Sequence, residues 1–302
     1  MLKIAHFMHS PSSLEFMGLN FSSLDYERYL VENPIHEFFD GLRPHNPSEK
    51  IILDPNFATT IVDTNSEVHA QPSNDIEYDD LVRLHYITRI RKVSTILEFG
   101  MGNSTVVFAD ALLKNKSDFH QQFVNTLRYS NLFECHSIEN YTKWIENCKE
   151  LIPQKFFEHG ISHIHKASLK MGTFSGKVCT YYDPLPDITP DLIYIDGPDQ
   201  YAPTGDVRGI TTRVPNRMPM AADVLSFEHF LTPGTLIIID GRTANARFLK
   251  SNLQRNWHYF YAKDFDQHFF ELLEEPLGIY NQEQINICLG NSYFDRLKKF
   301  SV

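Results

Sequence analysis

The chain has 302 residues, of which 42% are hydrophobic, and a formal net charge of -10 at pH 7. This length suits one large α/β domain with an extension, and the acidic balance argues against nucleic-acid binding, which usually needs a basic face. No apolar run reaches the roughly 18 residues of a membrane span, and the four cysteines show no metal or disulfide spacing. The first residues lack the long apolar stretch and the small-residue cleavage pattern expected of a signal peptide. We therefore expect a cytoplasmic protein that acts on a small molecule, not on nucleic acid or at a membrane.

Residues 1–73 are interpreted as an N-terminal extension that packs on the core as a lid. Apolar spacing predicts a helix over residues 24–31 and a second, short helix over residues 35–39. A variant capping box, Asn74-Asp-Ile-Glu77, predicts the start of the helix before the first core strand. The core domain is expected to span residues 74–302.

The first core strand is followed by a glycine turn and then by a helix. Its apolar run, Ile96–Phe99, is typical of a central parallel strand. Gly100 and Gly102 permit positive φ and close approach of a ligand to the backbone, and Ser104 and Thr105 offer hydroxyls to the first N–H groups of the helix. A strand, a glycine turn and a helix N-terminus together predict a nucleotide-type binding site.

Glu98 indicates which kind of nucleotide binds there. In a dinucleotide fold the turn faces a pyrophosphate, which a carboxylate two residues before the first glycine would repel, whereas a cationic ligand would be attracted. The sixth fingerprint position is Thr105 rather than glycine, and Glu139 follows much later than the roughly 20 residues expected for NAD. Both facts argue against a nicotinamide cofactor, and a nicotinamide-dependent oxidoreductase is kept as an alternative.

The motif Glu98-Phe-Gly-Met-Gly-Asn-Ser-Thr105 resembles the first motif of class I S-adenosylmethionine-dependent methyltransferases, of the small-molecule O-methyltransferase kind. The resemblance covers residues 75–273. It implies a doubly wound α/β fold with a mostly parallel seven-stranded sheet, helices on both faces and a C-terminal antiparallel hairpin. In that family the turn carries the methionine part of the cofactor. The resemblance therefore implies cofactor contacts at Glu98, Gly100, Gly102, Asn103, Ser104 and Thr105.

Residues 133–139 alternate as a second strand that ends on Glu139. A carboxylate at the end of a strand can accept two hydrogen bonds from a ribose diol, and the resemblance implies this role for Glu139. The alternative is a solvated acid that caps the following helix.

Residues 161–167 predict a third strand. The resemblance places the end of this strand beside the adenine, so Ala167 and Ser168 are candidate cofactor contacts. His163 and His165 share one face of the strand, and we interpret them as alternating strand residues rather than as a metal cluster.

Residues 191–197 and 234–241 predict the fourth and fifth central strands, and both segments end in Asp-Gly. Asp196 and Asp240 therefore join the two earlier acids at the carboxyl ends of strands, where open α/β sheets bind ligands. Asp196 is accordingly also a candidate cofactor contact.

The last part of the core closes the sheet. Residues 257–262 and 269–273 predict an antiparallel hairpin, and residues 285–289 predict an added edge segment. Between the first and second core strands, residues 117–131 are interpreted as a polar connection that follows the first helix.

Two interpretations of the strand-end acids stay open. In one, Asp196 and Asp240 hold Mg²⁺, as in catechol-type O-methyltransferases, but Gly241 stands where that family has an asparagine ligand. In the other, Asp196 or Asp199 acts as a general base, or orients the substrate, without a metal.

The loop over residues 198–220 leaves the catalytic end of the sheet, where loops usually select the substrate. Tyr201 and Arg208 in this loop, and Arg242 after the fifth strand, are candidate substrate contacts, and the arginines favour an anionic group. We therefore expect methyl transfer from S-adenosylmethionine to a small polar acceptor, at a hydroxyl of an anionic or sugar-like metabolite. A non-catalytic S-adenosylmethionine-binding module is the second alternative.

Overall fold

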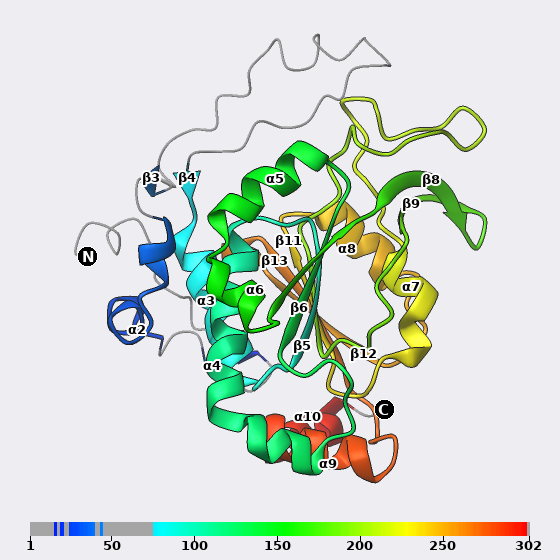
Figure 1. Ribbon diagram of the computed structural model, residues 1–302. Helices are drawn as coiled ribbons and strands as arrows, with labels where there is room; N and C mark the ends of the chain where they lie inside the picture. The colour runs from blue at the N-terminus through cyan, green and yellow to red at the C-terminus, as the bar shows by residue number, and fades with distance from the viewer. Residues whose placement is uncertain (1–14, 17–18, 21–23, 40–42, 45–74, 301–302) are drawn as a thin grey trace.

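A seven-stranded sheet forms the centre of the computed structural model, which describes residues 15–16, 19–20, 24–39, 43–44 and 75–300 (Figure 1). Its strands are β5 (Thr95–Phe99), β6 (Glu134–Glu139), β7 (Ser162–Lys166), β10 (Leu192–Ile195), β11 (Leu236–Asp240), β12 (Trp257–Ala262) and β13 (Gln267–Leu272). Their order across the sheet is β12-β13-β11-β10-β5-β6-β7. Strands β11, β10, β5, β6 and β7 are parallel, and β13 pairs antiparallel with β11 and β12. The predicted fold class is therefore confirmed.

The two faces of the sheet carry separate cores because side chains alternate along each strand. Ile96, Tyr194 and Ile238 belong to one core, whereas Leu97 and Ile193 belong to the other. Helices cover the first face: α3 (Tyr78–Ile90), α4 (Asn103–Thr126), α5 (Thr142–Leu151) and α6 (Gln154–Glu158). The second face is covered by α7 (Asp223–Phe227), the 3-10 helix η3 (Glu228–Phe230), α8 (Thr243–Lys250) and a β-hairpin.

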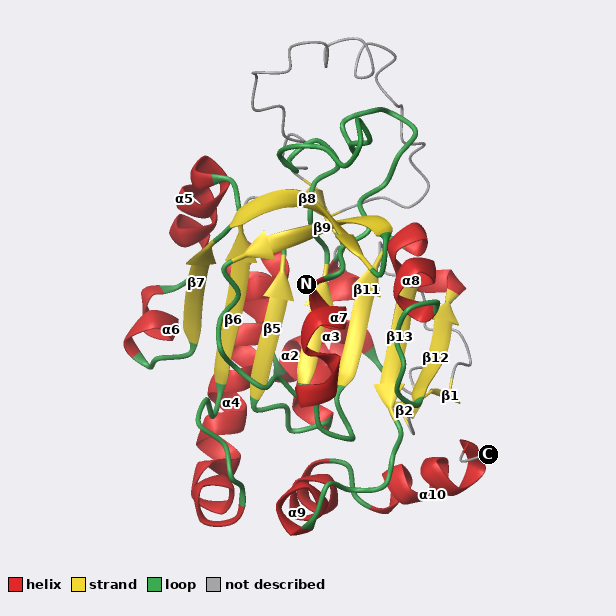
Figure 2. Ribbon diagram, turned by 90° about the vertical axis from the view of Figure 1, so that its right-hand side faces the viewer, coloured by secondary structure: helices red, strands yellow, loops and turns green. Residues whose placement is uncertain are grey.

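That hairpin consists of β8 (Ser168–Phe174) and β9 (Lys177–Asp183), and it crosses the carboxyl-end half of the sheet (Figure 2). Isolated bridges join Lys170 to Thr204 and Thr180 to Ala221, so both strands of the hairpin hold the loop over residues 198–220. The sequence predicts a strand over residues 178–182, which lies within β9, but does not predict its partner β8. The hairpin follows β7 in the chain and contacts the loop above the carboxyl ends of the parallel strands.

Helix α4 is longer than predicted, because it continues through residues interpreted above as a connection. Phe123 is fully buried and stacks on Phe133 with ring centroids 5.3 Å apart, which attaches the last turns of the helix to the core. The burial of Phe123, with the partly buried Phe119 one turn earlier, outweighs the polar composition of this segment.

The C-terminal residues lie beneath the amino ends of the parallel strands (Figure 2). They form α9 (Ile279–Cys288) and α10 (Asn291–Phe300), so the edge segment predicted over residues 285–289 is wrong. Arg91 Nη1 and Arg296 Nη2 lie 2.9 and 2.7 Å from Oε1 of the fully buried Glu271. The Arg296 pair connects α10 to β13, and the Arg91 pair connects the end of α3 to the same strand. A carboxylate buried this deeply needs such partners.

The described part of the N-terminal extension contains two helices. These are α2 (Tyr26–Glu32) and the 3-10 helix η2 (Ile35–Phe39), as predicted. The short strands near them in the chain are β1 (Glu15–Phe16), β2 (Leu19–Asn20), β3 (Arg43–Pro44) and β4 (Asp75–Ile76). A further 3-10 helix, η4 (Lys263–Phe265), joins β12 to β13. Tyr29 Oη lies 2.6 Å from His85 Nδ1, which attaches α2 to α3. Helix α3 begins after Glu77, whose side chain makes no capping bond, so the predicted capping box is wrong; Asn74 lies outside the described residues.

No helix in the described ranges combines the length and the apolar character needed to cross a membrane.

Candidate active site

Glu98 lies under the glycine turn and is fully buried. Its carboxylate accepts three hydroxyl hydrogen bonds, from Ser104 Oγ at 2.5 Å, Thr105 Oγ1 at 2.6 Å and Ser137 Oγ at 2.5 Å. Burial raises the pKa of Glu98 to about 7, although the three hydroxyls lower it. The carboxylate thus joins the end of β5 to the first turn of α4 and to the neighbouring strand β6.

This arrangement corrects two expectations. Glu98 does not present a free charge to a ligand above the turn, because both its oxygens accept bonds from the protein. The hydroxyls of Ser104 and Thr105 point back to Glu98, and Thr105 Oγ1 also accepts the Gly102 N–H at 3.1 Å. These side-chain hydrogen bonds fix the conformation of the glycine turn. A ligand at the turn would therefore contact its backbone.

Gly100 and Gly102 have different surroundings. Gly100 has a φ of +86°, and a Cβ placed there would lie 2.9 Å from Gly197 N and 3.0 Å from the Asp196 carbonyl. The backbones of β5 and β10 therefore approach as closely as they do because both turns carry glycine. Gly102 has an extended φ of -177°, and a Cβ there would meet no atom of the described residues within 4 Å. Space for a ligand therefore opens at Gly102, next to Asn103 at the first position of α4.

Glu139 ends β6, as predicted, and is partly exposed. Its Oε1 accepts the backbone N–H groups of Asn140 at 2.7 Å and Tyr141 at 3.0 Å, which fixes the carboxylate at the start of α5. Burial raises the pKa of Glu139. Helix α5 also contacts the glycine turn after β5, because Trp144 Nε1 donates to the Met101 carbonyl at 2.7 Å.

Tyr182 on β9 is a site residue that sequence reasoning missed. Its side chain is 4% exposed, and its hydroxyl has no hydrogen-bond partner among the described residues. A Cβ on Gly197 would lie 3.0 Å from this hydroxyl, which places it at the meeting point of the two glycine turns. Burial, together with the nearby charges of Glu139 and Asp223, raises the pKa of Tyr182 well above its ordinary value. A buried hydroxyl of this kind needs a partner, and a ligand at the turn can supply it.

The candidate adenine contacts lie where β7 passes into the hairpin. Ala167 is buried and donates its N–H to the Glu139 carbonyl at 3.0 Å, and Ser168 is exposed as the first residue of β8. The structure therefore brings Ala167 next to Glu139 on the neighbouring strand.

Asp196 and Asp240 end neighbouring strands, and each has a different partner. The Asp196 side chain is 50% exposed, with Oδ1 at 3.5 Å from Arg242 Nη2. Asp240 Oδ2 accepts the Tyr194 hydroxyl at 2.9 Å. Burial, followed by the nearby charge of Asp196, raises the pKa of Asp240 to about 7. The two carboxylates are thus close enough to affect each other's ionisation.

Arg242 has a structural role beyond the substrate contact predicted for it. Its Nη1 donates to the Pro198 carbonyl at 2.9 Å, and its Nη2 donates to the Asp196 carbonyl at 2.5 Å. The guanidinium therefore fastens the turn after β10 to the turn after β11.

The other predicted substrate contacts lie in the loop over residues 198–220. Asp199 Oδ1 accepts the N–H of Tyr201 at 2.7 Å, and Tyr201 is buried. Arg208 is exposed on a turn with a φ of +56°. Within this loop, Asp199 and Tyr201 are thus neighbours, whereas Arg208 lies on the outer turn formed by Val207 and Ile210.

A cavity of about 170 Å³ lies between the end of this loop and the start of α8. Its lining residues are Met218, Pro219, Gly241, Arg242, Thr243, Ala244 and Asn245. Asn245 is only 2% exposed, and neither its Nδ2 nor its Oδ1 has a hydrogen-bond partner among the described residues. A buried carboxamide that lines a cavity can donate one hydrogen bond and accept another from an occupant. Sequence reasoning missed Asn245, because nothing marks it as different from other helix residues before α8 is placed.

No protein-family model matches the chain, and no curated protein matches its sequence. Solved structures with a similar arrangement include the SAH-bound methyltransferase PaMTH1 of Podospora anserina, with 12% identity and a TM-score of 0.35 over 83% of this chain and 98% of that one. An O-methyltransferase from Bacillus cereus in complex with SAH shares 12% identity over 83% and 100% of the two chains, with a TM-score of 0.37.

The O-methyltransferase TomG from Streptomyces achromogenes, involved in tomaymycin synthesis and solved with SAM, shares 13% identity over 82% and 98%, with a TM-score of 0.37. At TM-scores below 0.5, these likenesses leave the assignment of a function to the residues of the chain itself. The sheet alone, with seven mostly parallel strands and a terminal antiparallel pair, fits the class I methyltransferase fold that the sequence predicts.

Proposed function

We propose that this protein is an S-adenosylmethionine-dependent methyltransferase that acts on a small polar acceptor, at a hydroxyl of an anionic or sugar-like metabolite. The observation that carries the proposal is the glycine turn after β5. It leaves open space at Gly102, and the Tyr182 hydroxyl without a partner in the described chain and the Glu139 carboxylate lie close to it.

These residues fit the cofactor. The open backbone at Gly102 and Asn103 would receive its methionine part, and Glu139 would accept hydrogen bonds from the ribose hydroxyls. Ala167 and Ser168 stand at the next strand end, where the adenine would lie. The Tyr182 hydroxyl would gain the polar partner that it lacks in the protein.

The bound cofactor supplies an electrophilic methyl group on a sulfonium. The chain contributes alignment of the acceptor oxygen and exclusion of water, which account for most of the rate in such displacements. Asp196, which is half exposed beside the turn, would accept the hydroxyl proton or orient the hydroxyl, with Asp199 as the other candidate base. Arg242 holds the carbonyls on both sides of Gly197 and so keeps Asp196 in position.

The cavity at the start of α8 is the place we assign to the acceptor. It is polar at one point, the Asn245 carboxamide, and Arg242 adds an Nε that has no partner among the described residues. A donor, an acceptor and a cationic group together favour a hydroxylated or anionic metabolite. Tyr201 and Arg208 in the adjoining loop are assigned to the outer part of this substrate site.

Mg²⁺ is not required by this proposal. Asp196 and Asp240 are two carboxylates, and Gly241 supplies no side-chain ligand next to them. Asp196 already has the Arg242 guanidinium as a cationic neighbour at 3.5 Å. Within the described ranges, these acids are not part of any group of three close metal-ligating side chains. The residues therefore fit a divalent ion poorly, and we derive no step from one.

We place the reaction in the cytoplasm, which agrees with four cysteines that are all free in the structure. The acidic net charge of -10 supports a small-molecule substrate rather than a nucleic acid.

Calorimetric titration with S-adenosylhomocysteine tests the proposal. We expect one binding site per chain, and an absence of binding at millimolar ligand would remove the hypothesis. A parallel fluorescence titration with NADH examines the oxidoreductase alternative, for which binding of NADH alone would be expected. Cofactor consumption with a cell lysate then separates an enzyme from a non-catalytic binding module, which would bind without turnover.

A further inference from the structure

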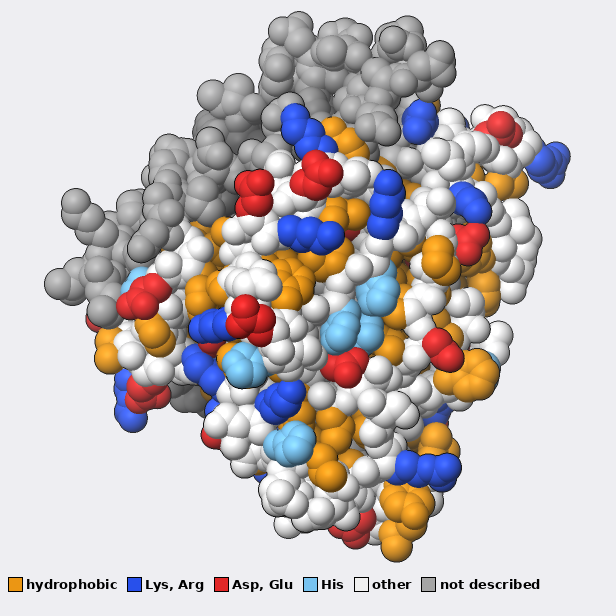
Figure 3. All heavy atoms as spheres, in the orientation of Figure 1, with side chains coloured by type: hydrophobic (Ala, Val, Ile, Leu, Met, Phe, Trp, Pro, Cys, Tyr) orange, Lys and Arg blue, Asp and Glu red, His pale blue; other side chains and the backbone are white. Residues whose placement is uncertain are grey.

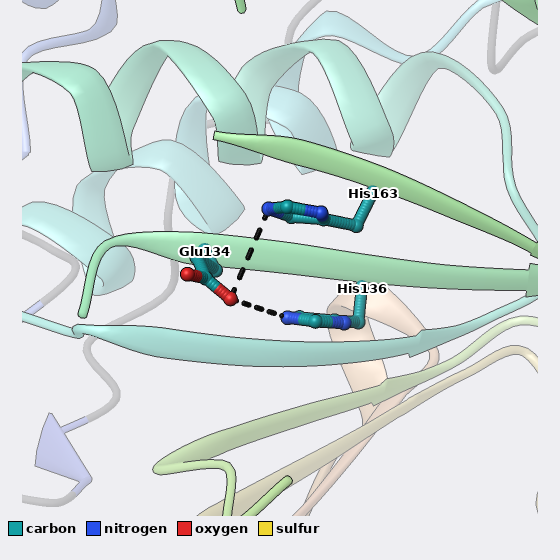
Figure 4. A group of neighbouring side chains, drawn as sticks. All are labelled: Glu134, His136 and His163. Carbon is teal, nitrogen blue, oxygen red and sulfur yellow. Dashed lines mark hydrogen bonds and ion pairs between the residues drawn. The ribbon is translucent and has the colours of Figure 1, made fainter. Parts of the chain in front are cut away.

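Three potential metal ligands meet on the second face of the sheet, at its edge. Glu134 and His136 lie on β6 and His163 lies on β7, and their polar ends point toward one another (Figure 4). Glu134 Oε2 lies 2.9 Å from His136 Nε2 and 3.8 Å from His163 Nε2. One ligand atom from each residue lies within 4.8 Å of the others, and no other such group occurs in the described chain. The parallel register of β6 and β7 pairs His136 with His163 and so brings the two imidazoles together.

The separations between the ligand atoms are close to those of a metal site. Zinc bonds of about 2.0–2.1 Å in a tetrahedron place neighbouring ligand atoms about 3.3 Å apart. The two oxygen–nitrogen distances lie on either side of this value. The imidazole rings of His136 and His163 are stacked, with centroids 4.7 Å apart and 12° between their planes, so one ring must rotate before both Nε2 lone pairs face one ion. His163 Nε2 also lies 3.2 Å from the Gly160 carbonyl, a contact that an ion would replace.

Neighbouring side chains orient the ligands. Asn131 Nδ2 donates to Glu134 Oε2 at 2.9 Å, and His165 Nε2 lies 2.9 Å from His136 Nδ1. With a metal on His136 Nε2, the Nδ1–H would donate to His165, which is the second hydrogen bond that metal-bound histidines usually make.

The group is open to solvent on one side. The His163 side chain is 38% exposed, and His163 and His165 line a groove of about 520 Å³ with Gln154 and Phe157. Histidine side chains also gather at the surface in the space-filling view (Figure 3). An ion can therefore enter, and water can occupy a fourth position.

We propose that Glu134, His136 and His163 bind one divalent transition-metal ion, with zinc as the preferred occupant. Two imidazoles and one carboxylate suit zinc and its neighbours, whereas Mg²⁺ and Ca²⁺ prefer all-oxygen ligands. Glu134 is five residues before Glu139 on β6, or about 16 Å at the usual rise of a strand, so this site is separate from the proposed cofactor site. Its ion joins the edge strand β7 to β6 and does not depend on the proposed methyl transfer.

The test uses the full chain without an affinity tag, stripped of metal with a chelator and titrated with Co²⁺, whose visible absorption reports nitrogen and oxygen coordination. We expect one equivalent per chain, with bands that disappear when Zn²⁺ is added. His163→Ala and His136→Gln should each weaken binding at least tenfold. His159→Ala is the matched control, because His159 is an exposed histidine just before β7 and outside the group.

Thermal unfolding gives a second readout. Zn²⁺ should raise the Tm of the unmodified chain and of His159→Ala, but not that of His163→Ala. Because His163 is partly exposed, His163→Ala should fold even if His136→Gln does not, and it decides the question alone. Absence of stoichiometric Co²⁺ binding by the unmodified chain, or equal affinity in His163→Ala, would overturn the proposal.

Discussion

Gly100 and Gly197 lie against each other where β5 and β10 end, and a Cβ on Gly100 would come within 2.9 Å of the Gly197 nitrogen. Gly100 also has a φ of +86°, in the left-handed region. Gly100→Ala should therefore lower the free energy of unfolding by about 3 kcal/mol, from backbone strain and from displacement of the opposing turn. Urea unfolding measures this loss. A change below about 0.5 kcal/mol would show that the two turns can separate at no cost.

Gly102→Ala should leave the stability of the fold almost unchanged but weaken cofactor binding. Its φ of -177° suits any residue, and the added methyl group would meet no described atom, so the free energy of unfolding should change by about 0.5 kcal/mol or less. The methyl group would occupy the space proposed for the methionine part of the cofactor. We expect S-adenosylhomocysteine affinity to fall at least tenfold by calorimetry. If affinity is unchanged, the cofactor does not approach the turn at this residue.

The strands and their terminal acids could be predicted because each carries its own local pattern. Leu192–Ile195 and Leu236–Asp240 are short apolar runs bounded by turn residues, which is typical of strands buried on both faces. The carboxyl ends of parallel strands share one edge, so Glu139, Asp196 and Asp240 could be assigned to one region without coordinates.

The remaining features depend on contacts that sequence spacing does not show. Strand β8 has no strong alternation and is stabilised by its pairing with β9, so the hydroxyl of Tyr182 could not be placed near Gly197. The role of Glu98 was also out of reach, because Ser137, one of its three donors, lies on another strand. Likewise, residues 285–289 have the composition of a strand but are part of a helix end that packs under the sheet.

Glu98 should make stability depend on pH. Its pKa is raised from 4.5 to about 7 in the folded protein, so the folded state binds this proton more tightly than the unfolded chain does. The corresponding stabilisation is complete below about pH 4.5 and is lost as pH rises through about 7, with a total of about 3 kcal/mol. Glu98→Gln removes the titrating group and should lack this component.

The measurement compares unfolding free energies of the two proteins at pH 5 and pH 8. Other carboxyls, such as Asp240, titrate in both proteins and cancel in the difference. Equal pH dependence in Glu98→Gln and the unmodified chain would contradict the assigned ionisation of Glu98.

Glu139→Ala should weaken S-adenosylhomocysteine binding by a few kcal/mol at most, because the bonds to the ribose are lost. The same substitution removes the acceptor for the Asn140 and Tyr141 N–H groups, so stability should fall by about 1 kcal/mol. Glu146→Ala, an exposed position on α5, controls for the lost charge. Calorimetry below the unfolding transition separates the two effects. Unchanged affinity would mean that Glu139 serves only the helix.

Tyr182→Phe should weaken ligand binding without lowering the stability of the fold. The Tyr182 hydroxyl is buried and has no hydrogen-bond partner in the described chain, so its removal should leave the free energy of unfolding unchanged or raise it by about 1 kcal/mol. If the cofactor supplies the missing partner, S-adenosylhomocysteine affinity should fall about tenfold, which corresponds to about 1.4 kcal/mol. Tyr181→Phe, one position earlier on β9, is the matched control, because the Tyr181 hydroxyl donates to the Thr173 carbonyl within the hairpin. A loss of stability without a loss of affinity in Tyr182→Phe would show that this hydroxyl serves the fold rather than the ligand.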